Sequence, residues 1–304
     1  MKRFKHLLVH LDLQGDHDQA AVRYASAVSR LGGSKRIEFV HTGPAPTLIA
    51  GFADDSPARA AAWLRESNAE VERLVHRHFR GPQGCRVQIQ VIGGAGFHDL
   101  LNQLRRQDTD LILVGKSETN VAFVEKLVRK APCSVMVVPP GRSVAYRRIL
   151  VTTDFSEHSA RAMEVAVAFA QARKLKQIHC FHGYQIPYGH HKTGIPVERF
   201  RRETEAWARD RYQQFQRAIR FGELRGTFIC QESPLVAQAI LRQAHQQPSD
   251  LLVMGARGQD ALSEALLGST TAQVVRETQI PTLVVKPKGA GRSFLDWLLG
   301  SERA

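Results

Sequence analysis

Short apolar runs rich in β-branched residues recur along the chain and alternate with longer stretches of helical periodicity. Each of the ten runs is six or seven residues long, which is typical of buried strands. Between the runs, Asp18–Leu31 and Ser159–Arg173 place apolar residues at helical spacing. Nearly all-apolar strands separated by helices predict a parallel sheet covered on both faces. The runs cover residues 6–12, 36–42, 86–92, 110–115, 133–138, 148–154, 177–183, 226–232, 250–255 and 281–286.

Three segments of the first half recur in the same order in the second half, which indicates two copies of one domain. We expect an α/β fold with two tandem doubly wound domains, each built on a five-stranded parallel sheet. The domains are predicted at 1–140 and 146–288, with a tail at 289–304. The matched segments are His6–Asp12 with Arg148–Asp154, Asp110–Gly115 with Asp250–Gly255, and Ala131–Pro139 with Ile280–Pro287.

Composition is that of a globular protein with an excess of positive charge. The chain has 304 residues, with 42 Lys+Arg against 29 Asp+Glu and a net charge of +13. Residues 1–145 hold 20 basic and 14 acidic residues, and residues 146–304 hold 22 and 15, so the excess belongs to both halves. A basic surface attracts polyanions. Because no aromatic-rich stretch accompanies the charge, we do not expect a nucleic acid as the main partner.

The spacing of the cysteines and the length of the apolar runs indicate the cellular compartment of the protein. Cys85, Cys133, Cys180 and Cys230 lie far apart and form no C-x-x-C pair, which excludes a disulfide scaffold. No apolar run approaches the 18 or so residues of a membrane helix. We therefore expect a cytoplasmic protein without a membrane span.

The segment after the fourth strand of the second copy carries the candidate chemistry. Two residues separate Gly255 from Gly258, and nine residues separate Gly258 from Gly268-Ser269-Thr270 at the start of a helical pattern. Glycines let the backbone approach a ligand closely, and a helix N-terminus rich in hydroxyls is a suitable phosphate site. The alternative is a glycine turn with a Ser/Thr cap that needs no ligand.

These residues give the chain a clear resemblance to the universal stress protein family, over about residues 4–140 and 146–288. The spacing of Gly255, Gly258 and Gly268-Ser269 matches the ATP-binding motif of that family, and Arg148–Glu157 resembles its opening strand and turn. The resemblance implies the strand order 3-2-1-4-5. It also implies an adenine nucleotide, ATP, held between the ends of the first and fourth strands, with Mg²⁺ as a companion that the sequence does not require.

Carried over by position, the resemblance assigns nine nucleotide-binding residues. Asp154 would accept a hydrogen bond from a ribose hydroxyl, or else cap the following helix. The others would lie at the adenosine, beside the adenine or around the phosphates. They are Thr152 at the adenosine, Gly183 beside the adenine, Arg257 as an added positive charge, and Gly255, Gly258, Gly268, Ser269 and Thr270 at the phosphates.

The first copy departs from this motif. Gly115 is 17 residues before Pro132, whereas Gly255 is 26 residues before Pro281, so nine residues of the phosphate loop are missing. Glu118 falls where the second glycine should be, and its carboxylate would repel a phosphate. We expect the first copy not to bind the same ligand, and Asp12 to act as a structural cap.

Three functions are compatible with these observations. The first is a stress-response protein in which ATP binding to the second domain regulates interactions; the absence of a recognisable nucleophile or general base favours it. The second is a slow ATPase. The third is a polyanion-binding protein, suggested by the net charge.

Three further segments raise separate expectations. The fifth strands of the two copies offer edges through which the domains could pair within one chain, or chains could form a homodimer.

His179, Cys180 and His182 lie close in sequence, but alternate strand positions face opposite ways, so we expect no metal site there or at His190-His191. The apolar stretch Ser293–Gly300 is expected to dock on the protein itself, on a partner or on a membrane surface.

Overall fold

A computed structural model gives the architecture of the chain. It describes residues 4–43, 56–94, 96–141, 144–187, 189, 194, 196–258 and 267–287. The chain forms two compact units, Met1–Val144 and Ala145–Ala304. The tail at 289–304 and the histidines at 190 and 191 lie outside the described residues.

The first unit is a five-stranded sheet in which every strand pairs in parallel with its neighbour. The strand order is β3-β2-β1-β4-β5. Its elements are β1 (His6–Leu11), α1 (Asp16–Gly32), β2 (Arg36–Gly43), α3 (Ser56–His78), β3 (Arg86–Gly93), α4 (Phe97–Arg106), β4 (Leu111–Gly115), α5 (Val121–Lys130) and β5 (Ser134–Val138).

The second unit repeats this topology with the order β8-β7-β6-β9-β10, again with parallel pairing throughout. Its elements are β6 (Ile149–Thr152), α6 (Glu157–Ala172), β7 (Gln177–Tyr184), α7 (Val197–Ala218), β8 (Arg225–Glu232), α8 (Val236–Gln246), β9 (Leu251–Gly255), α9 (Ser269–Glu277) and β10 (Thr282–Val285).

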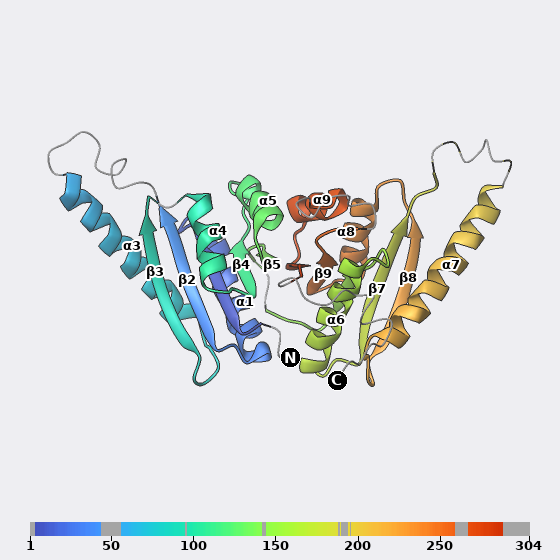
Figure 1. Cartoon of the computed structure of the whole chain (residues 1–304), viewed down its shortest axis with the longest axis horizontal. Helices are drawn as coiled ribbons and strands as arrows, with labels where there is room; N and C mark the ends of the chain where they lie inside the picture. The colour runs from blue at the N-terminus through green and yellow to red at the C-terminus, as the bar shows by residue number, and fades with distance from the viewer. Residues whose placement is uncertain are drawn as a thin grey trace. The chain divides into compact units, whose positions relative to one another are not determined.

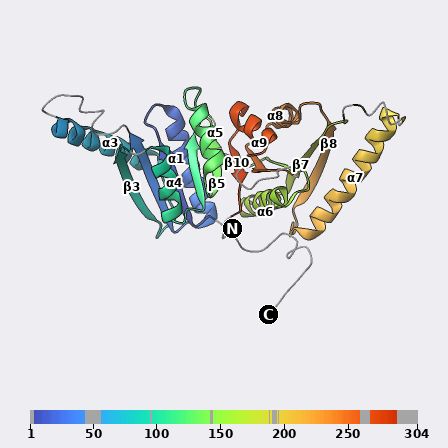
Figure 2. The same cartoon turned by 45° about the horizontal axis from the view of Figure 1, so that its top comes forward.

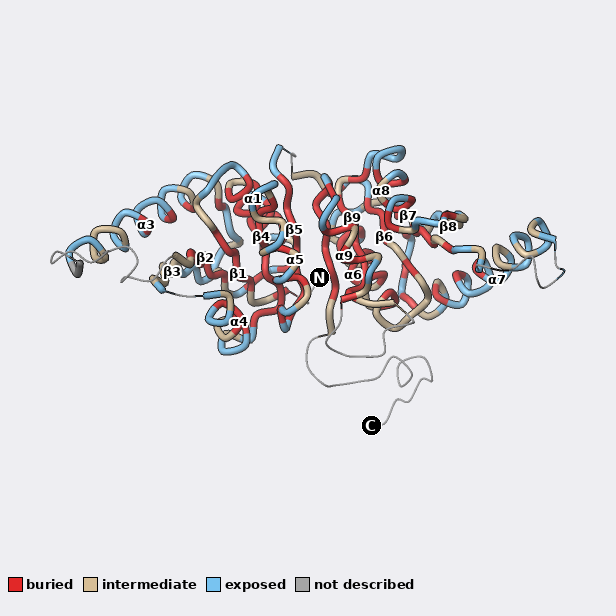
Figure 3. Tube along the Cα trace, turned by 90° about the horizontal axis from the view of Figure 1, so that it is seen from above, coloured by how far each residue is buried: buried red, intermediate tan, exposed pale blue. Residues whose placement is uncertain are grey.

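Helices cover both faces of each sheet. In the first unit α1 contacts α3 on one side of the strands, and α4 and α5 lie on the other side (Figures 1 and 3). In the second unit α7 runs alongside β8 and α8 packs on α9 (Figure 2). Figure 3 shows that burial is concentrated along the central strands, whereas α3 and α7 alternate between buried and exposed residues.

The fold class and the strand order expected from the sequence are confirmed. All ten strands lie within two residues of the predicted runs at either end. The central strands are buried on both faces and therefore give a continuous apolar pattern, whereas the outer strands β3 and β8 are exposed or half-buried throughout. The positions Val9, Leu113, Val151 and Val253 are fully buried in the described structure. No helix among the described residues has the length and apolar character needed to cross a bilayer.

Candidate functional site

The strand order of the second unit reverses between β6 and β9, although the two strands are parallel. The chain builds β6, β7 and β8 toward one edge, and then returns to place β9 and β10 on the other side of β6. Loops that leave β6 and β9 therefore diverge to opposite faces, and a crevice opens between them at the carboxyl ends of the strands. Ligands of doubly wound folds bind at this point.

A cavity of about 730 Å³ occupies this crevice. It is lined by the ends of β6, β7 and β9, the start of α9, and side chains from α7 and α8. All nine residues that the sequence proposed line it: Thr152, Asp154, Gly183, Gly255, Arg257, Gly258, Gly268, Ser269 and Thr270. The structure thus brings together residues that are more than 100 positions apart in the chain.

Asp154 follows β6 and faces the glycine loop. One carboxylate oxygen, Oδ1, accepts the amide of Ser156 at 3.0 Å, which is the local turn expected of an aspartate after a strand. A Cβ added at Gly258 would lie 2.5 Å from the other oxygen, Oδ2. Glycine at 258 therefore allows the loop backbone to approach the carboxylate closely. The cap at the start of α6 is made by Ser156, whose hydroxyl accepts the amide of Ser159 at 3.2 Å.

Packing requires a glycine at position 255 but not at position 268. A Cβ at Gly255 would meet the backbone of His158 at 2.9 Å, so helix α6 itself excludes a side chain there. A Cβ at Gly268 would make only ordinary contacts, the nearest being Arg257 Cα at 3.5 Å. The φ of Gly268 is −59°, a value open to any residue. Neither packing nor backbone conformation requires glycine at position 268.

Helix α9 begins at the cavity with free capacity for hydrogen bonds. Its N-cap residue, Gly268, provides no side-chain cap, so the first amides of the helix keep their donors for other partners. Ser269 is exposed and Thr270 half-buried. Thr271 is buried, and its hydroxyl donates to the carbonyl of Gly255 at 2.9 Å, which fixes the start of the helix against the end of β9.

Arg257 brings a positive charge to the same wall of the cavity. It acts on His158, whose pKa is lowered first by burial and then by the guanidinium of Arg257. The Nδ1 atom of His158 is buried without a hydrogen-bond partner. The pKa of His158 lies below its ordinary value of 6.5, so the imidazole is neutral at pH 7 and Arg257 supplies the positive charge.

An aromatic cluster that the sequence did not reveal also contributes to the cavity lining. Trp207 from α7 lines the cavity with 45 % of its surface exposed. Its ring centroid lies 5.6 Å from that of Phe155 and 6.3 Å from that of His182. The Nδ1–H of His182 donates to the carbonyl of Thr153 at 2.8 Å. Burial lowers the pKa of His182, so the imidazole is neutral at pH 7.

Gly183 lies beside a valine that comes from another element. A Cβ at Gly183 would meet Cγ1 of Val236 at 2.8 Å, and Val236 itself lines the cavity. The first residue of α8 therefore fills the space next to β7 that a larger residue at position 183 would occupy. The apolar surface for a ligand comes from α8 in this chain.

The corresponding place in the first unit is filled by its own side chains. Helices α5 and α9 end in the equivalent C-caps Ala131 and Thr278, so Phe123 corresponds to Thr270 of the second unit. By this match the first unit lacks seven residues of the loop (16 residues from Gly115 to Ala131 against 23 from Gly255 to Thr278) rather than the nine counted to the prolines. The Phe123 ring centroid lies 4.8 Å from that of His10 and 5.9 Å from that of Phe97. An aromatic cluster thus occupies the space of the phosphate-loop hydroxyls.

Asp12, the aspartate of the first unit that corresponds to Asp154, is hydrogen-bonded to side chains of its own unit. The Nε2 atom of His17 lies 2.8 Å from Oδ1 of Asp12, and Nδ2 of Asn120 donates to its Oδ2 at 3.0 Å. Burial alone would raise the pKa of Asp12, but these hydrogen bonds hold it at about 2. The hydrogen bond to Asp12 raises the pKa of His17. Asp12 is therefore an ionised structural anchor.

One group of side chains among the described residues has the composition of a metal site. Asp12, His17 and Asp18 place one ligand atom each within 4.8 Å of one another. The Asp18 carboxylate already accepts the amides of Leu13 at 2.7 Å and Asp12 at 3.4 Å. Hydrogen bonding accounts for this cluster. His179 and Cys180 are not part of such a group: Cys180 is fully buried and His179 half-buried.

Comparison with known proteins follows the same division of the chain. The model of the universal stress protein family matches residues 3–139 and 145–286. The chain belongs to the universal stress protein family. Both units are members, so the chain is a tandem universal stress protein.

Full-length and single-domain relatives are both present among similar proteins. The universal stress protein E homolog of Haemophilus influenzae is 23 % identical, over 94 % of this chain and 98 % of the relative. A universal stress protein of Thermus aquaticus is 31 % identical, over 46 % of this chain and 99 % of the relative. The crystal structure of a universal stress protein from Archaeoglobus fulgidus shares the fold, with a TM-score of 0.62 and 18 % identity over 92 % of this chain and 96 % of that one.

Proposed function

We propose that this universal stress protein binds one adenine nucleotide, ATP, in the cavity of its second unit, and that occupancy regulates its interactions during stress. The observation that carries the proposal is the convergence of nine residues, from four separate segments, on one cavity at the strand-order reversal. Its volume, about 730 Å³, falls within the range of small-molecule sites, roughly 300–1,000 Å³.

The lining of the cavity offers contacts for each part of a nucleotide. Arg257, the uncapped start of α9 and the hydroxyls of Ser269 and Thr270 supply polar and positively charged contacts for phosphates. Val236 and the indole of Trp207 supply apolar and aromatic surface that suits a purine ring. Asp154 faces Gly258 in the same lining, where a ribose hydroxyl can donate to it.

The glycine at position 268 supports a ligand-based explanation. Neither packing nor backbone conformation excludes a side chain there. A phosphate seated on the first amides of α9 would exclude one, because the ligand has to approach the backbone closely. The proposed ligand therefore explains why position 268 is a glycine.

Binding without turnover fits the described lining best. The cavity contains the neutral imidazole of His182, but its Nδ1–H is held by the carbonyl of Thr153. Asp154 is tied to the turn at Ser156. Hydrolysis would appear as phosphate release that Ser269→Ala reduces; we expect no release above background in either protein.

Calorimetric titration of the full chain with ATP tests the proposal. We expect one site per chain, no binding by Gly268→Val, and unchanged binding by Val121→Leu, which alters the matched position of the first unit. Thermal unfolding of both variants checks that they fold. Two sites per chain, equal binding by Gly268→Val, or no binding at millimolar ATP would overturn the proposal.

A further inference from the structure

Each unit carries cations where its strands begin, most of them exposed and Lys5 half-buried. In the second unit these positions are opposite the strand ends that line the cavity. The amide of Lys5 donates to Asp110 Oδ2 at 2.7 Å, and the amide of Arg147 donates to Asp250 Oδ2 at 3.0 Å. These matching hydrogen bonds show that Lys5 and Arg147 hold equivalent positions before the first strand of each unit.

The neighbouring strands repeat the match. The amide of Arg86 donates to the carbonyl of Lys35 at 2.9 Å, and the amide of Arg225 donates to that of Lys176, also at 2.9 Å. Lys35, Arg86, Lys176 and Arg225 are all exposed. We call the two rows the basic edges: Lys5, Lys35 and Arg86 in the first unit, and Arg147, Lys176 and Arg225 in the second.

Helix ends enlarge the basic edges. Gly33 and Lys174 follow α1 and α6 at equivalent positions, both in the left-handed region with φ of 57° and 53°. Lysine is disfavoured in that conformation and glycine is not. In the first unit the ammonium of Lys5 instead reaches the carbonyl of Gly33 at 3.0 Å. Both units thus place an ammonium group at this helix end, by different residues.

Fold stability does not account for the basic edges. Cations favour helix C-termini, which accounts for Lys5, whose ammonium donates to the carbonyls of Gly32 at 2.7 Å and Gly33 at 3.0 Å. That effect is confined to the last turn of a helix, so it does not account for Arg86 and Arg225, which begin strands. Like charges on adjacent strands destabilise a sheet. In the described part of the chain none of the six cations forms a salt bridge, and the carboxylates of Asp110 and Asp250 accept backbone amides instead.

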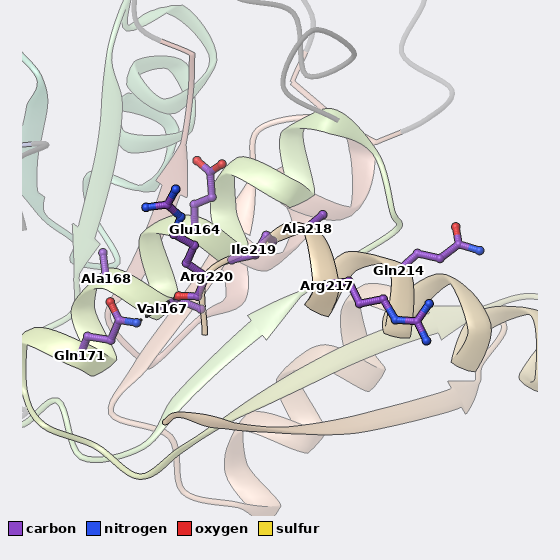
Figure 4. A pocket seen from close by; sticks show the side chains of 9 residues that line it. All are labelled: Glu164, Val167, Ala168, Gln171, Gln214, Arg217, Ala218, Ile219 and Arg220. Atoms are coloured by element: carbon purple, nitrogen blue, oxygen red, sulfur yellow. Dashed lines mark hydrogen bonds between the residues drawn. The ribbon is translucent and has the colours of Figure 1, made fainter. Parts of the chain in front are cut away.

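A groove extends the basic edge of the second unit. It lies between α6 and the end of α7, has a volume of about 780 Å³, and is lined by Arg217 and Arg220 together with Glu164 of α6 (Figure 4). The side-chain amide of Gln171 donates to the carbonyl of Arg220 at 3.1 Å and to that of Phe221 at 3.2 Å. These bonds hold the turn that carries Arg220, whereas Arg217 lies on the last turn of α7.

The burial of the aromatic side chains near the basic edges indicates which class of polyanion these edges can bind. The nearby aromatic side chains Phe4, Phe79 and Phe221 are only 2 %, 8 % and 9 % exposed. They are not available to stack on unpaired bases or to insert into a membrane interface. Contacts to a duplex backbone need only cations, and the sugar-phosphate chain supplies regularly spaced charge for a row of them.

We propose that the basic edges bind the phosphodiester backbone of duplex nucleic acid without regard to sequence. The lack of aromatic stretches, which disfavours nucleic acid as the main partner of this chain, argues only against recognition of bases. Because the cavity lies at the opposite edge of the sheet, nucleotide and duplex bind to separate surfaces. The proposal does not depend on the proposed function.

Fluorescence anisotropy with a labelled 30-base-pair duplex tests the proposal on the full chain. The edge variant is Lys35→Gln/Arg86→Gln/Lys176→Gln/Arg225→Gln. The control variant Arg65→Gln/Arg73→Gln/Arg202→Gln/Arg242→Gln removes the same charge from exposed positions on α3, α7 and α8. We expect wild-type affinity to fall steeply with salt. Losing four phosphate contacts should make the slope of log K against log salt shallower by roughly two to four.

At about 0.15 M salt, the edge variant should lose at least about tenfold in affinity and the control variant less than about threefold. Circular dichroism and thermal unfolding confirm that both variants remain folded. Equal losses in the two variants would show that net charge alone acts, and would overturn the proposal. So would a wild-type protein that binds anionic phosphatidylserine vesicles or inorganic polyphosphate but not the duplex.

Discussion

A methyl group added to Gly258 would lie 2.5 Å from Oδ2 of Asp154, well inside van der Waals contact. The glycine comes from the loop after β9, and the aspartate follows β6, about 100 residues earlier. The loop backbone and the carboxylate thus approach one another across the reversal point of the sheet. This distance links the glycine motif to the ribose position of the proposed nucleotide.

Gly258→Ala should weaken ATP binding at little cost in stability. The new Cβ meets the end of a flexible side chain, so Asp154 has to turn away and its hydrogen bond to the ribose is lost. A hydrogen bond to a charged group contributes about 1.5–3 kcal/mol, which corresponds to at least about tenfold in affinity. Titration calorimetry measures the loss, and urea unfolding the stability. Unchanged affinity would place Asp154 away from the ligand.

Gly255→Ala should destabilise the second unit. Its Cβ meets the backbone of His158 at 2.9 Å, which only a shift of α6 can relieve. Overpacking of this kind costs about 1–3 kcal/mol. Gly268→Ala is the matched control, because its Cβ makes only ordinary contacts. Urea unfolding should show a lower midpoint for the first variant only, and equal midpoints would refute the packing argument.

Trp207 should report nucleotide binding through its fluorescence. Its indole lines the cavity and is 45 % exposed, so a purine beside it would change its solvent contact. We expect ATP to quench the emission, and Trp207→Phe to lose the change while keeping the ring packed against Phe155. Trp63→Phe, at α3 of the first unit, is the control. A signal that survives in Trp207→Phe would exclude a ligand at this wall.

Stability of the first unit should decrease from about pH 4 to pH 8. Burial, and then the charge of Asp12, raise the pKa of Asp18 to about 7. A carboxyl group with a raised pKa stabilises the fold fully below its unfolded pKa of 3.8, and this contribution is lost as the pH rises through 7. The raised pKa of His17 acts in the same direction, because its contribution is lost above the unfolded value of 6.5.

Asp18→Asn isolates this effect, because asparagine keeps the acceptor for the amide of Leu13. The variant should show a flatter dependence of unfolding midpoint on pH between 5 and 8. Glu72→Gln, which alters an exposed carboxylate on α3, should behave as wild type. The hydrogen bonds of Asp12 affect stability only in acid. Because they lower the pKa of Asp12 from 3.8 to about 2, their contribution is lost as the pH falls from about 4 toward 2. Parallel curves for all three proteins would contradict this assignment.

The sequence alone determined the strands, the duplication and the position of the glycine motif. Strands buried on both faces leave a continuous apolar run, and a parallel sheet places their ends at one edge, so Asp154 and Gly255 had to meet. The same logic identified the missing loop after Gly115. These features depend on local pattern and on the order of elements, which one chain records directly. The pairing of the two domains stays a prediction.

Only the tertiary structure decided what fills each site. Trp207 and Val236 reach the cavity from α7 and α8, and Phe123 fills the matching space in the first unit. Which face of a helix meets a given strand end depends on how the helix packs and rotates against the sheet. An apolar residue on that face has the same periodicity whether it packs in a core or lines a cavity.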